Sequence, residues 1–390
     1  MRRWKLTIAA VIAIAIIILS TLLAANWIAQ QTKPQFYVGV EFAFSYNNGT
    51  SIENLVGQLK ALVDKVKDYT NLFVIGTPDI SFNQTALNEC CDYITKAGLN
   101  FIVLFTDQRN YTAENNPFSW IRQAQQKYGD KFIAIYRFDE PGGNQLDNGI
   151  SQVVYNAGTY SESALNYAAT DYENEYHAML QDWSVGEKIF TADYGLQWFD
   201  YRSGFDCVLT ELGNNQSRQI SIGLCRGAAN AQGKDWGAII TWTYTGAPYI
   251  ENGSQLYSDL TLSYDEGAKY DIVFDYPQDA NQYGILTNEH FEALQSFWSY
   301  IQKNPQMHGA DAGKVAYVLP ENYGFGCRNV NDTIWGLWNS DSLSNKVWGD
   351  VNKLIGEYGS GLNIVYNEPP YNNTYDSSYS KLYFWNQTIS

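Results

Sequence analysis

Residues 131–141 read KFIAIYRFDEP, an almost unbroken run of apolar and aromatic side chains that ends in two acids and a proline. A short run of this composition predicts a buried β-strand. The strand is expected to end at Asp139 and Glu140. It would therefore carry two carboxyl groups at its C-terminal end.

Segments of the same kind recur on both sides of this strand. Apolar strands alternate with helical segments over about 270 residues, which predicts a parallel (β/α)8 barrel. The strands are expected at 35–43, 71–77, 100–107, 131–141, 188–193, 205–211, 236–244 and 270–277, and the helices at 52–69, 85–97, 117–128, 161–184, 216–233, 256–268 and 287–303. An open doubly wound sheet is the alternative, but no glycine-rich phosphate loop follows the first strand.

The chain is expected to divide into an N-terminal segment (1–33), the barrel (34–308) and a small α/β annex (309–390). The annex begins at a linker, Gly309–Gly313. It is expected to contain strands at 314–320, 362–367 and 381–386 and a helix around 344–358. Because the annex is too short for a full core of its own, it is expected to pack on the barrel.

The N-terminal segment predicts a signal-anchor transmembrane helix. Arg2, Arg3 and Lys5 precede an apolar run over 6–25. A helix needs about 20 apolar residues to cross a bilayer, whereas the core of a cleaved signal peptide has only about 7–15. The positive flank stays in the cytoplasm. The protein is therefore expected to sit in the cell membrane with one span and most of the chain extracellular, with a long cleaved signal as the alternative.

Two residue patterns fit export from the cytoplasm. The glycosylation motif N-x-[ST] occurs eight times, at Asn48, Asn83, Asn110, Asn215, Asn252, Asn331, Asn372 and Asn386. Disulfides are permitted outside the cell, and an odd number of cysteines leaves one without an intramolecular partner. The cysteines are Cys90, Cys91, Cys207, Cys225 and Cys327, and the first choice for a disulfide is Cys207–Cys225.

The amino-acid composition limits the classes of ligand that the protein is expected to bind. The net charge is −16 and the pI is about 4.6, so a polyanion such as nucleic acid would be repelled. Aromatic residues make up 15% of the chain, and their flat rings suit the apolar faces of sugars. The only histidines, His177, His290 and His308, lack the spacing of a zinc site. No metal and no cofactor are expected.

In a barrel of this kind the active site lies at the C-terminal ends of the strands. The residues expected there as substrate-binding groups are Glu41, Asp107, Tyr136, Arg137, Asp139, Asp193, Tyr194, Trp242, Tyr244 and Asp275, and the expected catalytic pair is Glu140 and Glu211. Asp107, Asp193 and Asp275 could equally end strands and cap helices, whereas Glu is a poor cap. Arg137 could point into the barrel or away from it.

Acids gathered on one rim repel one another, which separates their pKa values. Cleavage of a glycosidic bond needs such a pair: one acid protonates the leaving oxygen, and one carboxylate attacks or stabilises the anomeric carbon. Carboxylates, amides and tyrosines would then bind the sugar hydroxyls, and tryptophan would stack on the ring.

The segment AIYRFDEP resembles the fourth strand of TIM-barrel glycoside hydrolases, in which an acid ends that strand. In the large retaining clan the motif is Asn-Glu-Pro and the glutamate is the acid/base, a role that the resemblance assigns to Glu140. Asp139 stands where that clan has asparagine. The seventh strand, IITWTY, lacks the carboxylate of the clan's nucleophile, and Glu211 is the nearest substitute. The annex resembles the small domain that follows the barrel in some β-galactosidase-like enzymes.

The sequence therefore favours an extracellular, membrane-anchored glycoside hydrolase that acts on an oligosaccharide, a polysaccharide or a glycoconjugate. One alternative is a non-catalytic carbohydrate-binding or surface protein on the same scaffold. Another is a different barrel enzyme, such as a transglycosylase or a hydrolase that resembles polysaccharide deacetylases.

Overall fold

The computed structural model describes residues 36–45, 51–106, 116–183, 185–213, 216–241, 243, 249–277, 281–310 and 312–389. Within these ranges, no helix is both long enough and apolar enough to span a membrane. The expected signal-anchor segment, residues 1–33, lies outside them, and so do Asp107, Trp242 and Tyr244.

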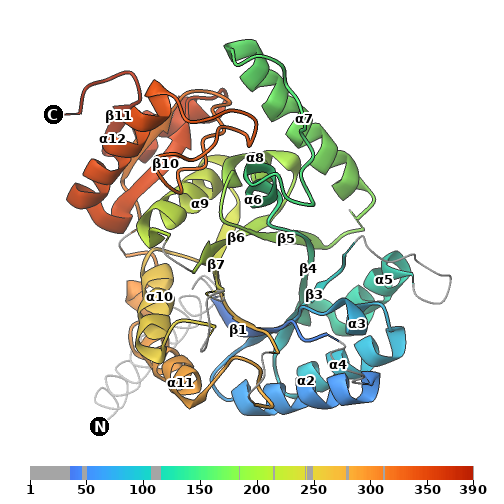
Figure 1. The fold of residues 1–390 in the computed structure, drawn as a ribbon. Coiled ribbons are helices and arrows are strands. Elements are labelled where there is room, and N and C mark those ends of the chain that lie inside the picture. The colour runs from blue at the N-terminus through green and yellow to red at the C-terminus, as the bar shows by residue number, and fades with distance from the viewer. Residues whose placement is uncertain are drawn as a thin grey trace, which may run out of the picture. The chain divides into compact units, whose positions relative to one another are not determined.

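Eight parallel strands close into a barrel in chain order, as predicted (Figure 1). Each strand pairs with the next, and β8 pairs back with β1. The strands are β1 (Tyr37–Phe42), β2 (Leu72–Ile75), β3 (Asn100–Leu104), β4 (Phe132–Asp139), β5 (Lys188–Asp193), β6 (Cys207–Leu212), β7 (Asp235–Ile240) and β8 (Tyr270–Asp275).

Helices follow the strands and surround the barrel in Figure 1. They are α2 (Ile52–Val66), α3 (Pro78–Ser81), α4 (Gln84–Lys96), α5 (Pro117–Tyr128), α6 (Pro141–Leu146), α7 (Glu162–Gln181), α8 (Gln197–Ser203), α9 (Arg218–Gln232), α10 (Gly253–Asp265) and α11 (Asn288–Lys303), with 3₁₀ turns at Gly129–Lys131 and Pro305–Met307. Their sequences explain both their ends and their orientation. In α2, for example, the Ser51 side chain caps the first turn and Leu55, Leu59 and Leu62 are buried at helical spacing.

Side chains from alternate strand positions fill the barrel interior. At the N-terminal end of the barrel the ring of Tyr37 stacks on that of Tyr270 at 5.2 Å, and Phe190 packs edge-on against Tyr270 at 4.8 Å. These rings close that end with packed aromatic carbon. The opposite end, where the strands terminate, is left for polar side chains.

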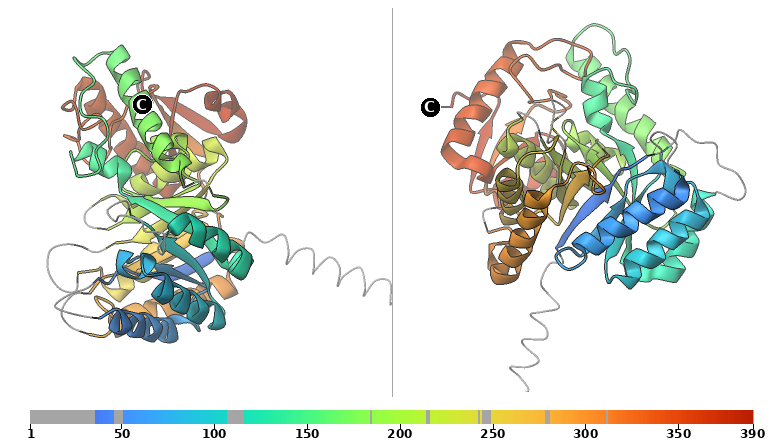
Figure 2. Two further views of the ribbon diagram at one scale, coloured as in Figure 1. Left: turned by 90° about the vertical axis from the view of Figure 1, so that its right-hand side faces the viewer. Right: turned by 60° about the horizontal axis from the view of Figure 1, so that its bottom comes forward.

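The annex consists of a three-stranded parallel sheet in the order β10-β9-β11. Its elements are β9 (Val315–Leu319), α12 (Ser342–Tyr358), β10 (Leu362–Tyr366), α13 (Tyr375–Ser378) and β11 (Lys381–Phe384), with 3₁₀ turns at Gly359–Gly361 and Tyr371–Thr374. Tyr37–Ser390 form one compact unit, which holds both barrel and annex (Figure 2).

Helix α9 carries the contact between barrel and annex. A Cβ placed on Gly223 or Gly227 would overlap the backbone of β10, so the absence of side chains there lets helix and strand approach closely. Arg226 is 1% exposed; it pairs with Glu266 and donates from Nε to Asn363 Oδ1 at 2.7 Å. A buried charge is tolerated only when it is paired in this way.

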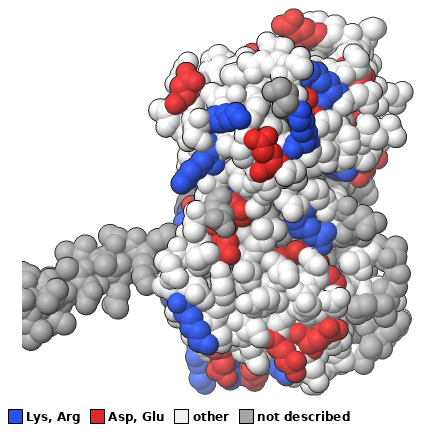
Figure 3. All heavy atoms as spheres, turned by 90° about the vertical axis from the view of Figure 1, so that its left-hand side faces the viewer, with Lys and Arg blue, Asp and Glu red and all other residues white. Residues whose placement is uncertain are grey.

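The face shown in Figure 3 is mostly uncharged, and its basic and acidic side chains lie in small mixed groups. This fits the low share of charged residues, 17%. Because the two signs alternate, the face offers no extended basic surface to a polyanion.

The expected Cys207–Cys225 disulfide is wrong: both cysteines are free and buried. Cys207 belongs to the cluster inside the barrel, whereas Cys225 lies on α9 outside it. The Cys225 thiol donates instead to Val208 O at 3.4 Å. The wall of the barrel therefore separates the two sulfur atoms.

Candidate active site

Strand β4 bends where it delivers its two acids. Phe138 and Glu140 both have left-handed backbone conformations, with φ of 54° and 53°. The pairing of β4 with β5 shifts register between Tyr136 and Asp139. Bulges and strained residues of this kind re-aim side chains and are common at functional sites. The bend is fixed by hydrogen bonds to β5, among them Glu140 N to Ala192 O at 3.0 Å.

A buried carboxylate holds the helix that follows Glu140. Asp193 is fully buried and accepts hydrogen bonds from the backbone N–H groups of Gly142, Gly143 at 2.8 Å and Gly195 at 3.0 Å. A Cβ on Gly142 would overlap the loop after β5, and one on Gly143 would overlap the ring of Tyr194. The Pro-Gly-Gly start of α6 therefore lets the carboxylate reach two N–H groups of this helix, and this fixes the position of Glu140.

The carboxyl groups of Glu140 and Glu211 are hydrogen-bonded to each other. Glu211 lies at the end of β6 and is 7% exposed. Burial, followed by the charges of Asp139 and Asp193, raises the pKa of Glu140 to about 7. Burial and the charge of Glu140 raise the pKa of Glu211 well above its usual range. The charge of Glu140 disfavours ionisation of Glu211, so the two carboxyl groups lose their protons in separate steps.

Two further acids lie beside this pair. Burial, then the charge of Asp139, raises the pKa of Glu41 to about 8. The Glu41 carboxyl group has room here because Gly76 lacks a side chain. A Cβ on Gly76 would overlap that carboxyl group. Asp139 accepts a hydrogen bond from the Tyr136 hydroxyl. The Asp139 side chain is exposed to solvent. The surrounding protein atoms nevertheless raise its pKa by desolvation, and the hydrogen bond from Tyr136 acts in the opposite direction.

Three cavities meet at the C-terminal mouth of the barrel. The polar cavity, of about 290 Å³, is lined by Glu140, Asp147, Tyr194, Glu211, Gly213, Gln216, Thr241 and Arg328. The central cavity, of about 340 Å³, is lined by Glu41, Ala43, Gly76, Leu104, Tyr136, Asp139, Glu140, Ala192, Glu211, Ile239, Thr241, Phe274 and Tyr276. The large cavity, of about 620 Å³, is lined by Leu104, Thr106, Arg137, Phe138, Asp139, Glu140, Asn144, Ile150, Ser151, Gln152, Val153, Tyr176 and Met179. Glu140 lines all three.

The structure brings seven of the expected site residues to these cavities: Glu41, Tyr136, Arg137, Asp139, Glu140, Tyr194 and Glu211. Asp193 and Asp275 line none of the three cavities. Asp275 is fully buried and accepts from Ile285 N at 3.0 Å, so it holds the segment after β8. Three expected site residues, Asp107, Trp242 and Tyr244, lie outside the described residues.

Arg137 points away from the barrel axis, because its neighbour Tyr136 occupies an inward position on β4. Its guanidinium lies 3.9 Å from the ring centroid of Trp183 and donates to Phe105 O.

Several residues at the mouth were not foreseen from the sequence. Arg328, from the annex loop, donates to Asp332 at 2.7 and 2.9 Å and to Asp147 at 2.8 Å. Asp147 also accepts from the Tyr194 hydroxyl at 2.7 Å. Nothing in the sequence marks a loop so far along the chain as part of the barrel mouth.

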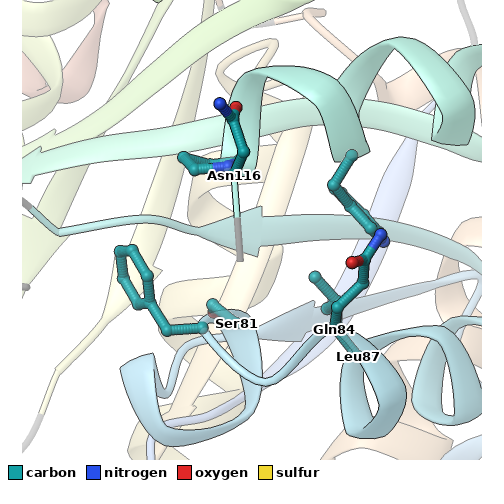
Figure 4. A pocket seen from close by; sticks show the side chains of 7 residues that line it. Ser81, Gln84, Leu87 and Asn116 are labelled. Carbon is teal, nitrogen blue, oxygen red and sulfur yellow. The ribbon is translucent and has the colours of Figure 1, made fainter. Parts of the chain in front are cut away.

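A fourth pocket, away from the mouth, is too small for a substrate. It lies between α3, α4 and α5 and is lined by Ser81, Phe82, Gln84, Leu87, Asn116, Pro117 and Trp120 (Figure 4). Its volume, about 10 Å³, is roughly that of one water molecule. Across the described ranges, no cluster of three or more His, Cys, Asp or Glu residues could hold a metal ion.

No protein-family model matches the chain, and no curated protein matches it in sequence. Solved structures do match. A GH5_18 variant from Streptomyces cattleya in complex with Manb1-4GlcNAc has a TM-score of 0.55 and 11% identity, over 90% of this chain and 99% of that one. A GH5_18 variant from Bifidobacterium longum with the same ligand has a TM-score of 0.51 and 10% identity, over 91% and 97%.

Alpha-L-fucosidase isoenzyme 2 from Paenibacillus thiaminolyticus also matches, with a TM-score of 0.51 and 11% identity over 89% of this chain. The match spans 60% of the fucosidase chain. At these identities the likeness concerns the fold. The chain therefore has the TIM-barrel fold of glycoside hydrolases, with no single family assigned.

Proposed function

We propose that the protein is a retaining glycoside hydrolase, with Glu140 as general acid/base and Glu211 as nucleophile. The observation that carries the proposal is the hydrogen-bonded pair of carboxyl groups at the mouth of the barrel. In inverting enzymes the two carboxyls stand about 6.5–9.5 Å apart, with a water molecule between the sugar and the base. The side-chain interaction between Glu140 and Glu211 favours the shorter separation of retaining enzymes, about 5–5.5 Å.

In the first step the protonated Glu140 gives its proton to the glycosidic oxygen as the bond from that oxygen to the anomeric carbon breaks. The ionised Glu211 attacks the anomeric carbon and forms an ester. In the second step Glu140, now ionised, takes a proton from water, whose oxygen displaces Glu211. The result is one molecule of water consumed and both carboxyl groups restored.

Before substrate binds, burial and the charge of Glu140 favour the protonated form of Glu211. The proposed reaction needs the opposite arrangement. The transition state supplies a reason for the shift, because it carries positive charge at the anomeric carbon. A positive charge beside Glu211 favours its ionised form, so the proton moves to Glu140.

The test is hydrolysis of a panel of 4-nitrophenyl glycosides and of Manb1-4GlcNAc, with proton NMR of the first anomer formed. Wild-type protein is expected to release a product of retained configuration. Glu140→Gln and Glu211→Gln should each lower kcat at least about 100-fold. Glu175→Gln, at an exposed position on α7, is the control. An inverted first product would refute the assignment of Glu211. Binding without hydrolysis would favour the non-catalytic alternative.

The location of the protein, outside the cell on a membrane anchor, is also a proposal. It is supported by the apolar run 6–25 with its basic flank and by the glycosylation motifs. Of those motifs, Asn252, Asn331 and Asn386 are exposed. Protease added to intact cells should digest the barrel without prior lysis of the cells. Protection of the chain in intact cells would contradict the proposal.

A further inference from the structure

The three cavities are not equivalent with respect to the two proposed catalytic residues. Glu211 lines the polar and central cavities, whereas the large cavity is reached by Glu140 alone. The sugar whose anomeric carbon is attacked lies beside the nucleophile, and the leaving group lies beside the acid that protonates it. The leaving group therefore belongs in the large cavity.

Several side chains in the wall of the large cavity are apolar and would pack favourably against a hydrocarbon group of a ligand. Leu104, Ile150, Val153 and Met179 contribute aliphatic or thioether surface. Ile150 is 91% exposed, so its side chain meets water over almost its whole surface. Apolar surface left in water at a cavity indicates a site for an apolar ligand.

Three polar side chains of this cavity, those of Asn144, Gln152 and Tyr176, already donate hydrogen bonds within the protein. Gln152 donates to Asn148 Oδ1 and to Val154 O. The Tyr176 hydroxyl donates to Ser151 O at 2.8 Å. The Asn144 amide donates to the backbone oxygens of Asp139 and Glu140. A sugar in this cavity would therefore depend for its hydrogen bonds on the acids at the edge of the cavity, Asp139 and Glu140.

The aromatic rings of the cavity are not placed to stack on a sugar either. Phe138 has the guanidinium of Arg137 over its ring at 4.4 Å and packs at 75° against Tyr176. Tyr176 also packs against Tyr172 at 4.9 Å and is 1% exposed. Sugar recognition generally uses an open ring face. These rings instead form an apolar floor.

We propose that the large cavity binds an apolar leaving group, an alkyl or aryl aglycone, so that the substrate is an amphiphilic glycoside rather than a longer sugar chain. This inference rests on the proposed function for the direction of cleavage. The apolar ligand class rests on the walls of the cavity alone. The polar cavity, which both Glu140 and Glu211 line, would hold the sugar whose anomeric carbon is attacked.

The test separates ligand class from catalysis. Octyl and methyl 1-thio-β-D-glucopyranoside resist hydrolysis and differ only in the alkyl chain, so their affinities are compared by calorimetry below the micelle concentration. The octyl compound is expected to bind at least about tenfold more tightly. Ile150→Ser should reduce this ratio, whereas Tyr167→Ser, which removes an exposed apolar side chain of α7 outside the cavity, should not.

Equal affinities, or a ratio that Ile150→Ser leaves unchanged, would overturn the inference even in a protein that hydrolyses glycosides. So would a kcat/KM for Manb1-4GlcNAc above that for alkyl and aryl glycosides. Preference for the octyl compound in a protein that hydrolyses no glycoside would refute the proposed function and would support the apolar site.

Discussion

Replacement of Glu140 by glutamine is expected to stabilise the protein while abolishing hydrolysis. The pKa of Glu140 is raised to about 7 from 4.5, which at about 1.4 kcal/mol for each pKa unit corresponds to about 3 kcal/mol. The folded state binds the proton more tightly than the unfolded state. Wild-type protein therefore loses stability as the pH rises from about 4.5 to 7, and the loss is complete above that range.

Glutamine is neutral at every pH and has nearly the same shape as glutamate. At about pH 4 the variant should match wild type, and at about pH 8 its free energy of unfolding should be higher by up to about 3 kcal/mol. Removal of Glu140 also takes away one charge that raises the pKa of Glu211, and this acts in the same direction. The wild-type protein has a lower free energy of unfolding at high pH because it holds several acidic side chains close together, as the proposed catalysis requires.

The assay is urea unfolding of both proteins at the two pH values, followed by intrinsic fluorescence. Glu175→Gln is the matched control; a substitution at an exposed surface should change stability by less than about 0.5 kcal/mol at either pH. A Glu140→Gln variant that is less stable than wild type at high pH would refute the reasoning. So would a difference between the two proteins that does not change with pH.

Three further substitutions probe the surroundings of the pair. Asp193→Ala leaves three backbone N–H groups without their acceptor and should lower the free energy of unfolding by about 3 kcal/mol in urea titrations; unchanged stability would exclude its role as an anchor. Arg328→Ala should raise KM about tenfold with a smaller change in kcat, because it removes a wall of the polar cavity; an effect on kcat alone would contradict this. Asp139→Asn removes a charge that raises the pKa of Glu140, so the alkaline fall in kcat/KM, expected near pH 7, should move to lower pH; a move to higher pH would count against the assignment.

The barrel itself could be predicted from the sequence because its strands are apolar runs separated by amphipathic helices. The acids at the strand ends could also be found, but not which of them face the mouth. The alternation of side chains along each strand decides this. On β6, Cys207 and Leu209 face inward, so Glu211 does too; on β5, Ala192 faces inward, so Asp193 faces away.

The same alternation explains why Asp275 lies outside the cavities: Tyr270 and Ile272 occupy inward positions of β8, so Asp275 faces away from the barrel interior. It would also have excluded the Cys207–Cys225 disulfide, since an inward side chain of β6 cannot meet a helix outside the barrel. Strand β4 breaks the rule through its shifted register and the positive φ of Phe138. Local backbone geometry of that kind is not encoded in the pattern of apolar residues.

The annex loop is packed against the helix that fixes Glu140. The Gln145 side chain of α6 donates to Trp335 O at 2.9 Å, and Thr333 donates to Leu146 O at 3.1 Å. A Cβ on Gly336 would overlap the backbone at Gln145. An expression clone that stops at the end of the barrel would therefore yield a protein whose acid is released from its support. Activity of the barrel would then depend on a part of the chain that supplies none of the proposed catalytic residues.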